Sequence, residues 1–431
     1  MKRTFKKFTH KLLRKILPHL PKKLQYKLVL GNLKLDYHLP HDVTFKIADT
    51  EDELLQAYEI IHDCYVEMKY DIPHEEKIRV TKYHALPHTS VLIIKIKDEV
   101  VGTCTFVPDG PFGLPIESIS NITDLRKNSE HIVEISALAI KKEYRKWKTN
   151  LLIPLVKYCF KYINEYKGAD RAVIAVAPES VWYYELLFGF FKVTAKPQEY
   201  SMVQGAKAMV LHVHYKDSRK KIWHNFSHLE KEKNIYSYLY NHKFEHNFEY
   251  PQYKEHLTVD SLINPHIIET FFKKKVNLLD QMEPKDLLTL RYLYHRKSFL
   301  DKMGGDHLVG HPDIKDPELR YMVKCRIKIY DPITHTFLDG RAANISENGI
   351  KISLKNSIHE SLKERKQLII KIRLDDDEQV NLLTIPCWGS EGNQFGLRIL
   401  NSENPVWQEF IQRMNEEYLT STEQGEEALG A

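Results

Sequence analysis

The chain has 431 residues, of which 42% are hydrophobic and 11% aromatic, and this is enough for two or three domains with buried cores. Gly and Pro number only 17 and 19, and no run of 18 apolar residues occurs, so the composition excludes a collagen-like protein and a membrane-spanning helix. The net charge is +5, yet residues 1–35 hold eleven basic and no acidic side chains, which leaves −6 for the rest. The basic character therefore belongs to the amino-terminal tail.

The tail, residues 1–35, places apolar side chains at helical spacing and basic side chains between them. The apolar positions are Phe5, Phe8, Leu12, Leu13, Ile16 and Leu17. Such a helix can lie on an anionic membrane surface, pack on the protein's own body, or act as a basic arm for nucleic acid. Our partner prediction is the membrane, through residues 1–20, and not nucleic acid.

Residues 40–215 alternate strand and helix patterns. A strand is predicted over 43–47, and Thr50 with Glu53 forms a capping box that opens a helix. Further strands are predicted over 91–97, 100–107, 132–140, 172–177 and 208–215, with helices over 150–166 and 181–188. The order predicts a mixed α/β domain.

Three segments of this domain resemble the GNAT acyltransferase superfamily. They are Glu134-Ile-Ser-Ala-Leu-Ala-Ile140, residues 173–178 and residues 184–190. Within the superfamily they look most like the acyl-homoserine-lactone synthases and the N-acyl amino acid synthases. The resemblance implies a mixed central sheet flanked by helices and transfer of an acyl chain to an amine. Ala137 stands where these relatives usually carry Arg, so the role of that arginine does not carry over.

Acyl transfer needs a base for the amine and a proton for the leaving thiolate. Glu134 is the candidate base if burial raises its pKa, and Ser136 shares its strand face and could orient the amine or a water. The resemblance implies that Tyr184 protonates the leaving sulfur. The alternatives are a salt-bridged Glu134, a hydrogen-bonded Ser136 and a Tyr184 that only packs in the core.

The loop after the central strand bears on the donor. CoA-using relatives have small residues there, which let backbone amides approach the pyrophosphate, whereas this chain has Lys148 and Asn150. The loop is basic instead, through Lys141, Lys142, Arg145, Lys146 and Lys148. This patch suits an acidic acyl carrier protein as the thioester donor, and the alternative is a solvated loop.

Residues 216–310 are polar, aromatic and helical in pattern, and are expected to form a helical extension that shapes the acyl channel. Residues 317–415 then show six short strands and a final helix, which predicts a small β-barrel. Residues 416–431 are expected to be a disordered tail.

The barrel segment contains Asn344-Ile-Ser-Glu-Asn-Gly349, which resembles the signature of the PilZ domain. The resemblance implies that Asn344, Ser346 and Gly349 face cyclic di-GMP, with Arg320 as the first of two arginines. The position of the second arginine is occupied by Lys324. Lysine keeps the positive charge but lacks the bidentate hydrogen bonding and the planar stacking surface of a guanidinium group. The alternative is a ligand-free interaction barrel.

The five cysteines include no Cys-x-x-Cys pair, which argues against disulfides and structural zinc and favours a reducing, cytoplasmic setting. His212 and His214 lack a third ligand at a recognisable spacing, so no metal site is expected. We also expect no covalently bound cofactor.

The sequence therefore predicts a cytoplasmic N-acyltransferase, peripheral at the inner membrane face, that moves a fatty acyl chain from acyl carrier protein to an amino acid or similar amine. Cyclic di-GMP would regulate it through the barrel. The rival interpretation is a non-catalytic cyclic di-GMP effector whose GNAT-like body binds a partner protein or a membrane surface.

Overall fold

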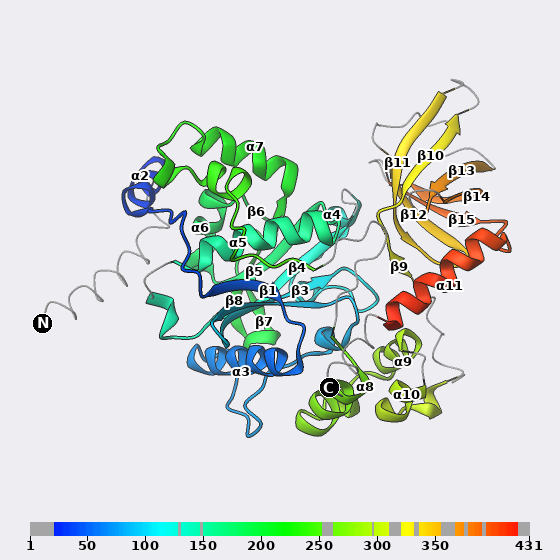
Figure 1. Ribbon diagram of the computed structural model, residues 1–431, viewed down its shortest axis with the longest axis horizontal. Helices are drawn as coiled ribbons and strands as arrows, with labels where there is room; N and C mark the ends of the chain where they lie inside the picture. Colours follow the sequence, from blue (N-terminus) through cyan, green and yellow to red (C-terminus); the bar gives the residue numbers. More distant parts are fainter. Residues whose placement is uncertain are drawn as a thin grey trace, which may run out of the picture.

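A computed structural model describes residues 21–127, 131–146, 150–251, 262–294, 297–309, 320–331, 336–354, 367–374, 378–389 and 394–420. The chain forms an α/β domain and a smaller β-barrel beside it (Figure 1). The predicted fold class is thus confirmed. The membrane-binding segment predicted over residues 1–20 lies outside the described ranges. No helix in the described part of the chain is both long and apolar enough to cross a bilayer.

The α/β domain is built on one mixed sheet with the strand order β1-β2-β3-β4-β5-β8-β6. The strands are β1 (Val43–Ile47), β2 (Ser90–Ile96), β3 (Glu99–Pro108), β4 (Ile132–Ile140), β5 (Arg171–Val176), β6 (Phe191–Lys192), β7 (Gln198–Tyr200), which pairs with β8, and β8 (Ala206–His214). All pairs are antiparallel except β4 with β5. The single parallel pair places the beginning of β4 next to the beginning of β5.

Local sequence signals explain how this sheet starts. Helix α3 (Glu51–Glu67) begins where predicted, because the Thr50 hydroxyl accepts from the Glu53 backbone N–H at 3.2 Å. The Glu53 carboxylate reaches back to the N–H of Asp49 instead of that of Thr50. The hairpin between β2 and β3 turns through Lys97, which adopts φ 56°. Both elements were predicted from the sequence.

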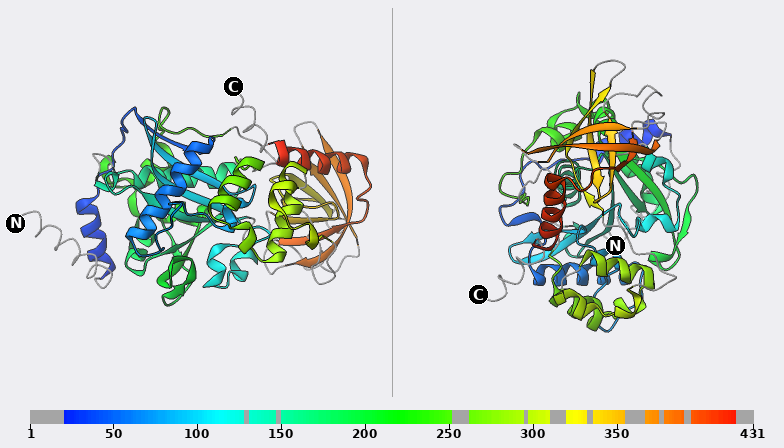
Figure 2. Two further views of the ribbon diagram at one scale, coloured as in Figure 1. Left: turned by 90° about the horizontal axis from the view of Figure 1, so that it is seen from below. Right: turned by 90° about the vertical axis from the view of Figure 1, so that its right-hand side faces the viewer.

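Helices cover both faces of the sheet (Figures 1 and 2). One face packs against α2 (Lys22–Asn32), α5 (Leu152–Lys161) with its π-helical continuation η5 (Tyr162–Tyr166), α6 (Val181–Leu187) and α7 (Tyr215–Phe226). The other packs against α3, α8 (Pro265–Ile267) with η10 (Ile268–Lys275), α9 (Pro284–Leu293) and α10 (Lys297–Met303). The extension predicted over residues 216–310 is therefore split between the two faces, because it crosses from one apolar surface to the other.

Short helical segments connect these elements. They are η2 (Lys82–Ala85), η3 (Pro115–Ser118), α4 (Thr123–Lys127), η4 (Tyr144–Lys146), η6 (Pro178–Ser180), η7 (Ser201–Val203), η8 (Lys231–Lys233), η9 (Ser237–Asn241), η11 (Leu279–Gln281) and η12 (Asp306–Leu308). Two of them, η2 and η3, contribute to the site described below.

The carboxy-terminal domain is a closed barrel of six antiparallel strands, in which β10 pairs with both β13 and β11. The strands are β10 (Arg326–Asp331), β11 (Thr336–Ile345), β12 (Gly349–Leu354), β13 (Leu368–Arg373), β14 (Gln379–Gly389) and β15 (Gln394–Ile399), and β9 (Tyr321–Met322) adds to β11. Alternate residues such as Ile327 and Ile329 fill the interior.

Helix α11 (Pro405–Thr420) packs against the barrel through Trp407, Phe410 and Met414, which are fully buried. The helix is longer than the sequence predicted. Residues 416–420 are helical, so the helix overlaps the tail predicted over residues 416–431. Residues 421–431 lie outside the described part.

Candidate functional site

The central strand β4 changes its pairing just after Glu134. Strand β5 pairs with β4 only from Ile132 to Glu134. Three residues after Glu134 the ladder with β3 contains a bulge, where Ala137 adopts φ 51°. A bulge bends its strand and interrupts the ladder, so the β5-facing edge of β4 beyond Glu134 has no strand partner among the described residues. Backbone groups at such an edge can contact a ligand.

The Glu134 carboxyl is buried on the face of the sheet covered by α3. Its side chain accepts a hydrogen bond from the backbone N–H of Ile116, at the start of η3, at 2.9 Å. Burial raises the pKa of Glu134 to about 8, with a further rise from Glu117 and an opposing effect of the Ile116 hydrogen bond. The group is therefore protonated near neutral pH but within reach of deprotonation.

Three tyrosines lie within electrostatic range of that carboxyl. They are Tyr65 on α3, Tyr83 on η2 and Tyr200 at the end of β7. Burial is the main cause that raises the pKa of Tyr65 and of Tyr83 to about 12, and the Glu134 charge adds to it in both. The pKa of Tyr200 is raised for the same two reasons. No local sequence pattern reveals this cluster, because its members come from three separate segments.

A buried histidine adjoins Ser136 through Thr105. The Nδ1 atom of His84 accepts from the backbone N–H of Thr81 at 3.0 Å, so in the neutral ring Nε2 carries the hydrogen and donates to Thr105 Oγ1 at 3.2 Å. Thr105 pairs with Ser136 across the β3–β4 ladder. Burial and then the Arg79 charge lower the pKa of His84 to about 4, so the ring is neutral at pH 7.

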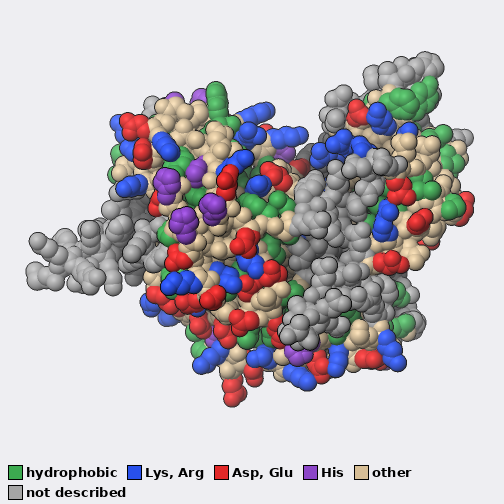
Figure 3. Space-filling view, viewed as in Figure 1, with side chains coloured by type: hydrophobic (Ala, Val, Ile, Leu, Met, Phe, Trp, Pro, Cys, Tyr) green, Lys and Arg blue, Asp and Glu red, His purple; other side chains and the backbone are tan. Residues whose placement is uncertain are grey.

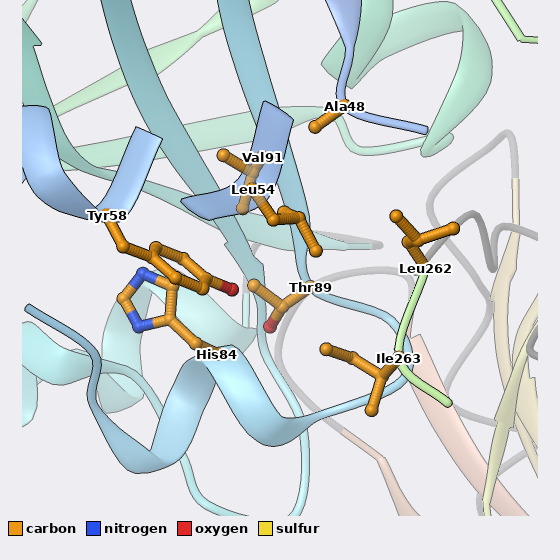
Figure 4. A pocket seen from close by; sticks show the side chains of 8 residues that line it. All are labelled: Ala48, Leu54, Tyr58, His84, Thr89, Val91, Leu262 and Ile263. Carbon is orange, nitrogen blue, oxygen red and sulfur yellow. The ribbon is translucent and has the colours of Figure 1, made fainter. Parts of the chain in front are cut away.

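His84 also borders a small cavity (Figure 4). Its lining consists of Ala48, Leu54, Tyr58, His84, Thr89, Val91, Leu262 and Ile263. The His84 ring meets the Tyr58 ring edge-on, with centroids 5.2 Å apart. The cavity is little larger than a water molecule, so it is too small to hold an acyl chain.

Tyr184 lies across the sheet from Glu134. Its half-buried ring, on α6, packs with Phe188 and Phe190 at centroid distances of 6.2 and 5.7 Å. Burial raises the pKa of Tyr184 to about 12, with smaller contributions from Cys159 and Cys104 on the same side. The fold thus brings Glu134 and Ser136 to one face of the sheet and Tyr184 to the other.

The basic loop after β4 is partly ion-paired. Lys141 contacts Glu99 at 2.7 Å, while Lys142 and Arg145 contact Glu67 at 2.9 and 2.8 Å. The Lys146 side chain and Lys148, which complete the predicted carrier-binding patch, lie outside the described part of the structure. The patch therefore carries less net charge than its sequence indicates. Its exposed ion pairs are weak and can exchange partners.

Four of the five predicted nucleotide-binding residues gather on the barrel. Arg320 Nη1 donates to Asn344 Oδ1 at 3.3 Å. Ser346 is buried, and its N–H donates to the Gly349 carbonyl at 2.8 Å. A Cβ on Gly349 would lie 3.1 Å from Ser346 Oγ and 3.6 Å from Arg320 Nη2, so glycine keeps this surface open.

The fifth residue, Lys324, faces the α/β domain. Its ammonium group donates to the carbonyl oxygens of Glu165 and Tyr166, each at 3.2 Å. Beside it, His131 Nε2 lies 3.1 Å from the Val323 carbonyl oxygen. Lys324 therefore contributes to the junction between the two domains.

The two histidines on β8 have protein partners. Arg171 Nη1 lies 2.7 Å from His212 Nδ1, and His214 lies 2.9 Å from Asp217. Within the described ranges, no group of three or more His, Cys, Asp or Glu side chains could hold a metal ion.

Part of the chain matches a known family model. Residues 56–214 match the family model of the N-acyl amino acid synthase FeeM. The acyltransferase prediction is confirmed. The matched segment contains Glu134, Ser136 and Tyr184, and within the acyltransferase domain it spans the whole sheet except β1.

Solved structures similar to the chain include FeeM from uncultured soil microbes, with 20% identity over 41% of this chain and 93% of that chain and a TM-score of 0.36. The CoA-dependent acyl-homoserine lactone synthase BjaI, with SAM and isopentyl-CoA, shows 14% identity over 49% and 95% of the two chains and a TM-score of 0.38. The PilZ domain of YcgR from Escherichia coli with c-di-GMP shows 12% identity over 26% and 95% and a TM-score of 0.20. Comparison with curated proteins found no match.

Proposed function

We propose that residues 40–215 catalyse transfer of a fatty acyl chain from an acyl carrier protein thioester to the amine of an amino acid or a similar compound. The observation that carries this proposal is the buried, proton-holding carboxyl of Glu134, which lies where β4 loses its partner inside the segment that matches FeeM. A carboxyl whose pKa is near 8 can take a proton from an ammonium group and return it near neutral pH.

In the proposed reaction, Glu134 in its carboxylate form removes a proton from the acceptor ammonium. The free amine attacks the thioester carbonyl carbon, the C–N bond forms, and the C–S bond breaks, while the nitrogen gives its second proton to water as the amide forms. Tyr184 gives its proton to the leaving thiolate and later recovers one from solvent. Backbone N–H groups at the open edge of β4 stabilise the negative charge on the carbonyl oxygen.

Ser136 has a positioning role in this scheme. It lies on the same strand face as Glu134 and opposite Thr105, whose hydroxyl is held by His84. We propose that Ser136 orients the incoming amine or a bridging water toward the Glu134 carboxylate.

The proposed donor rests on the basic loop. Acidic groups of a carrier protein would replace Glu67 and Glu99 as partners of Lys142, Arg145 and Lys141. Such an exchange steers association and weakens with salt. Equal use of acyl-CoA and acyl carrier protein at every salt concentration would contradict this choice of donor.

The decisive experiment compares the Glu134→Gln variant with the unchanged enzyme, by mass spectrometry of lipid extracts from cells that overexpress each. We expect an acylated amine from the unchanged enzyme and a loss of about 100-fold or more in the variant. Glu59→Gln, an exposed carboxylate change on α3, is the matched control. Product from Glu134→Gln at the control level would remove Glu134 from the mechanism.

We further propose that cyclic di-GMP binds the barrel at Arg320, Asn344, Ser346 and Gly349 and regulates the enzyme. Ligand phosphate would attract Lys324 away from the carbonyls of Glu165 and Tyr166, and so alter the contact beside the start of β4. Calorimetry on the full chain should show weak binding that Arg320→Ala abolishes and Lys324→Arg strengthens. If neither the native chain nor Lys324→Arg binds cyclic di-GMP, the barrel is an interaction domain and not a nucleotide sensor.

The rival interpretation, a non-catalytic effector, rested on Ala137 and on the lack of small residues in the loop after β4, and the match of residues 56–214 to the FeeM family model favours the enzyme instead. If the lipid extracts contain no acylated amine while the chain still binds cyclic di-GMP, the proposed acceptor class is wrong. A basic tail that binds the inner membrane face through residues 1–20 fits either proposal.

A further inference from the structure

A row of apolar side chains crosses the outer surface of the barrel. Tyr330 pairs with Phe337 across β10 and β11, and the β10–β13 register places Ile369 on its other side. Ile369 pairs with Leu383 on β14. Phe337, Ile369 and Tyr330 are 60%, 58% and 40% exposed, although large apolar side chains usually point inward. We call Phe337, Tyr330, Ile369 and Leu383 the apolar row.

Basic side chains form the next layer on the same surface. Two residues from the apolar row, Lys328 on β10 pairs with Lys371 on β13, and both are exposed. Two residues further, Arg326 pairs with the exposed Arg341. Among the described residues named in these pairs, the one acidic side chain is Asp339, which pairs with Lys328. The outer face of β10, β11 and β13 is thus apolar at one end of the strands and cationic in the layers next to that end.

The apolar row lies at the end of the barrel away from the α/β domain. Lys324 contacts that domain, and Tyr330 is six residues further along the strand that follows, which corresponds to about 20 Å of extended chain. Strands β10 and β11 project away from the α/β domain in Figure 1, and Figure 3 shows hydrophobic side chains near that end with basic ones close by. The row is therefore open to a large flat partner.

We propose that this face docks on an anionic lipid surface. Neighbouring residues on the same face of a strand are about 7 Å apart. When the apolar row inserts at the boundary between the headgroups and the acyl chains, Lys328 and Lys371 therefore reach the headgroup layer. Tyr330 suits the interface, since its ring is apolar and its hydroxyl polar. An acidic protein could match the charge, but it would not require the apolar residues to be outermost. This favours the membrane as occupant.

The proposal is independent of catalysis, and its test uses the full chain with residues 1–20 unchanged. Sedimentation with phosphatidylcholine vesicles, with and without phosphatidylglycerol, measures binding. The Phe337→Ser/Ile369→Ser variant should lose about tenfold in partition to anionic vesicles, because two apolar side chains no longer enter the membrane. Ile72→Ser is the matched control, since Ile72 is also 58% exposed but lies on the α/β domain. Lys328→Glu/Lys371→Glu should reduce binding to anionic vesicles only.

A second measurement does not depend on loss of binding. The Tyr330→Trp variant should gain fluorescence quenching by brominated lipids, relative to the unchanged chain, when anionic vesicles are added. Unchanged partition of the apolar-row variant together with no added quenching would overturn the proposal. If the same variant instead lost salt-sensitive binding to acyl carrier protein, the face would be a protein-docking surface and the membrane assignment would be wrong.

Discussion

The ammonium group of Lys324 lies 3.2 Å from the carbonyl oxygen of Tyr166, across the junction between the barrel and the acyltransferase domain. Tyr166 ends η5, the continuation of α5, and the last carbonyls of a helix lack partners within it. A lysine ammonium satisfies two of them, with a favourable interaction with the helix dipole. Lys324, the fifth residue of the predicted nucleotide site, is thus engaged in the contact between the two domains.

Gly168 gives a direct test of this contact. It has φ 66°, and a Cβ there would lie 2.4 Å from Lys324 Cδ, so Gly168→Ala should displace Lys324. Gly205 has φ 75° with nothing near its Cβ position, so Gly205→Ala is the control for the backbone cost, about 1 kcal/mol. By calorimetry, we expect cyclic di-GMP to bind Gly168→Ala severalfold more tightly than Gly205→Ala. Equal affinities would show that the contact does not compete with the ligand.

The rate should depend on pH through Glu134. A base must be deprotonated to act, and the pKa of Glu134 is raised to about 8, so kcat/KM should rise about tenfold per pH unit below pH 8 and level off above it. The acceptor amine titrates as well, so the profile is compared with that of Glu134→Gln. In the variant, kcat/KM for any residual activity should lack the part of the increase with pH that is assigned to Glu134. Identical profile shapes would assign the titration to the amine alone.

Acid should destabilise the protein through its buried histidines. Burial is the first cause that lowers the pKa of His84 and of His131 to about 4, and of His88 to about 3. Between pH 6.5 and these values the unfolded chain binds protons that the folded chain does not, so stability is present above pH 6.5 and falls with pH. Each group contributes up to about 1.4 kcal/mol per pH unit.

The thermal unfolding midpoint measured from pH 7 to pH 5 tests this expectation. His131→Gln keeps a donor for the Val323 carbonyl but removes one titrating group. The midpoint of this variant should fall less steeply with acid than that of the unchanged chain. Parallel curves would mean that His131 is not held neutral.

The basic loop should respond to loss of its internal partner. Glu67→Gln removes the carboxylate that contacts Lys142 and Arg145, so both become available to an acidic carrier. We expect the KM for acyl carrier protein to fall severalfold at low salt, with the difference lost at high salt. Glu59→Gln, an exposed change on the same helix, should leave KM unchanged. A rise in KM for Glu67→Gln would indicate that the ion pairs instead hold the loop in its binding shape.

Local patterns in the sequence determined the elements. The Thr50 N-cap, the hairpin around Lys97 and the alternating residues of the barrel act over a few residues, so their patterns are readable in the sequence alone. The same alternation put Glu134 and Ser136 on one strand face. The bulge at Ala137 follows them, so it left this relationship intact.

Only the tertiary structure decided which distant groups meet. The raised pKa of Glu134 comes from the packing of α3, η2, η3 and β7 around it, and the position of Tyr184 across the sheet depends on where the helix before β6 packs. Lys324 looks like a weak nucleotide ligand in sequence, yet it contacts a helix end 158 residues earlier in the chain. Contacts of this kind arise from burial and charge in three dimensions, and no local spacing records them.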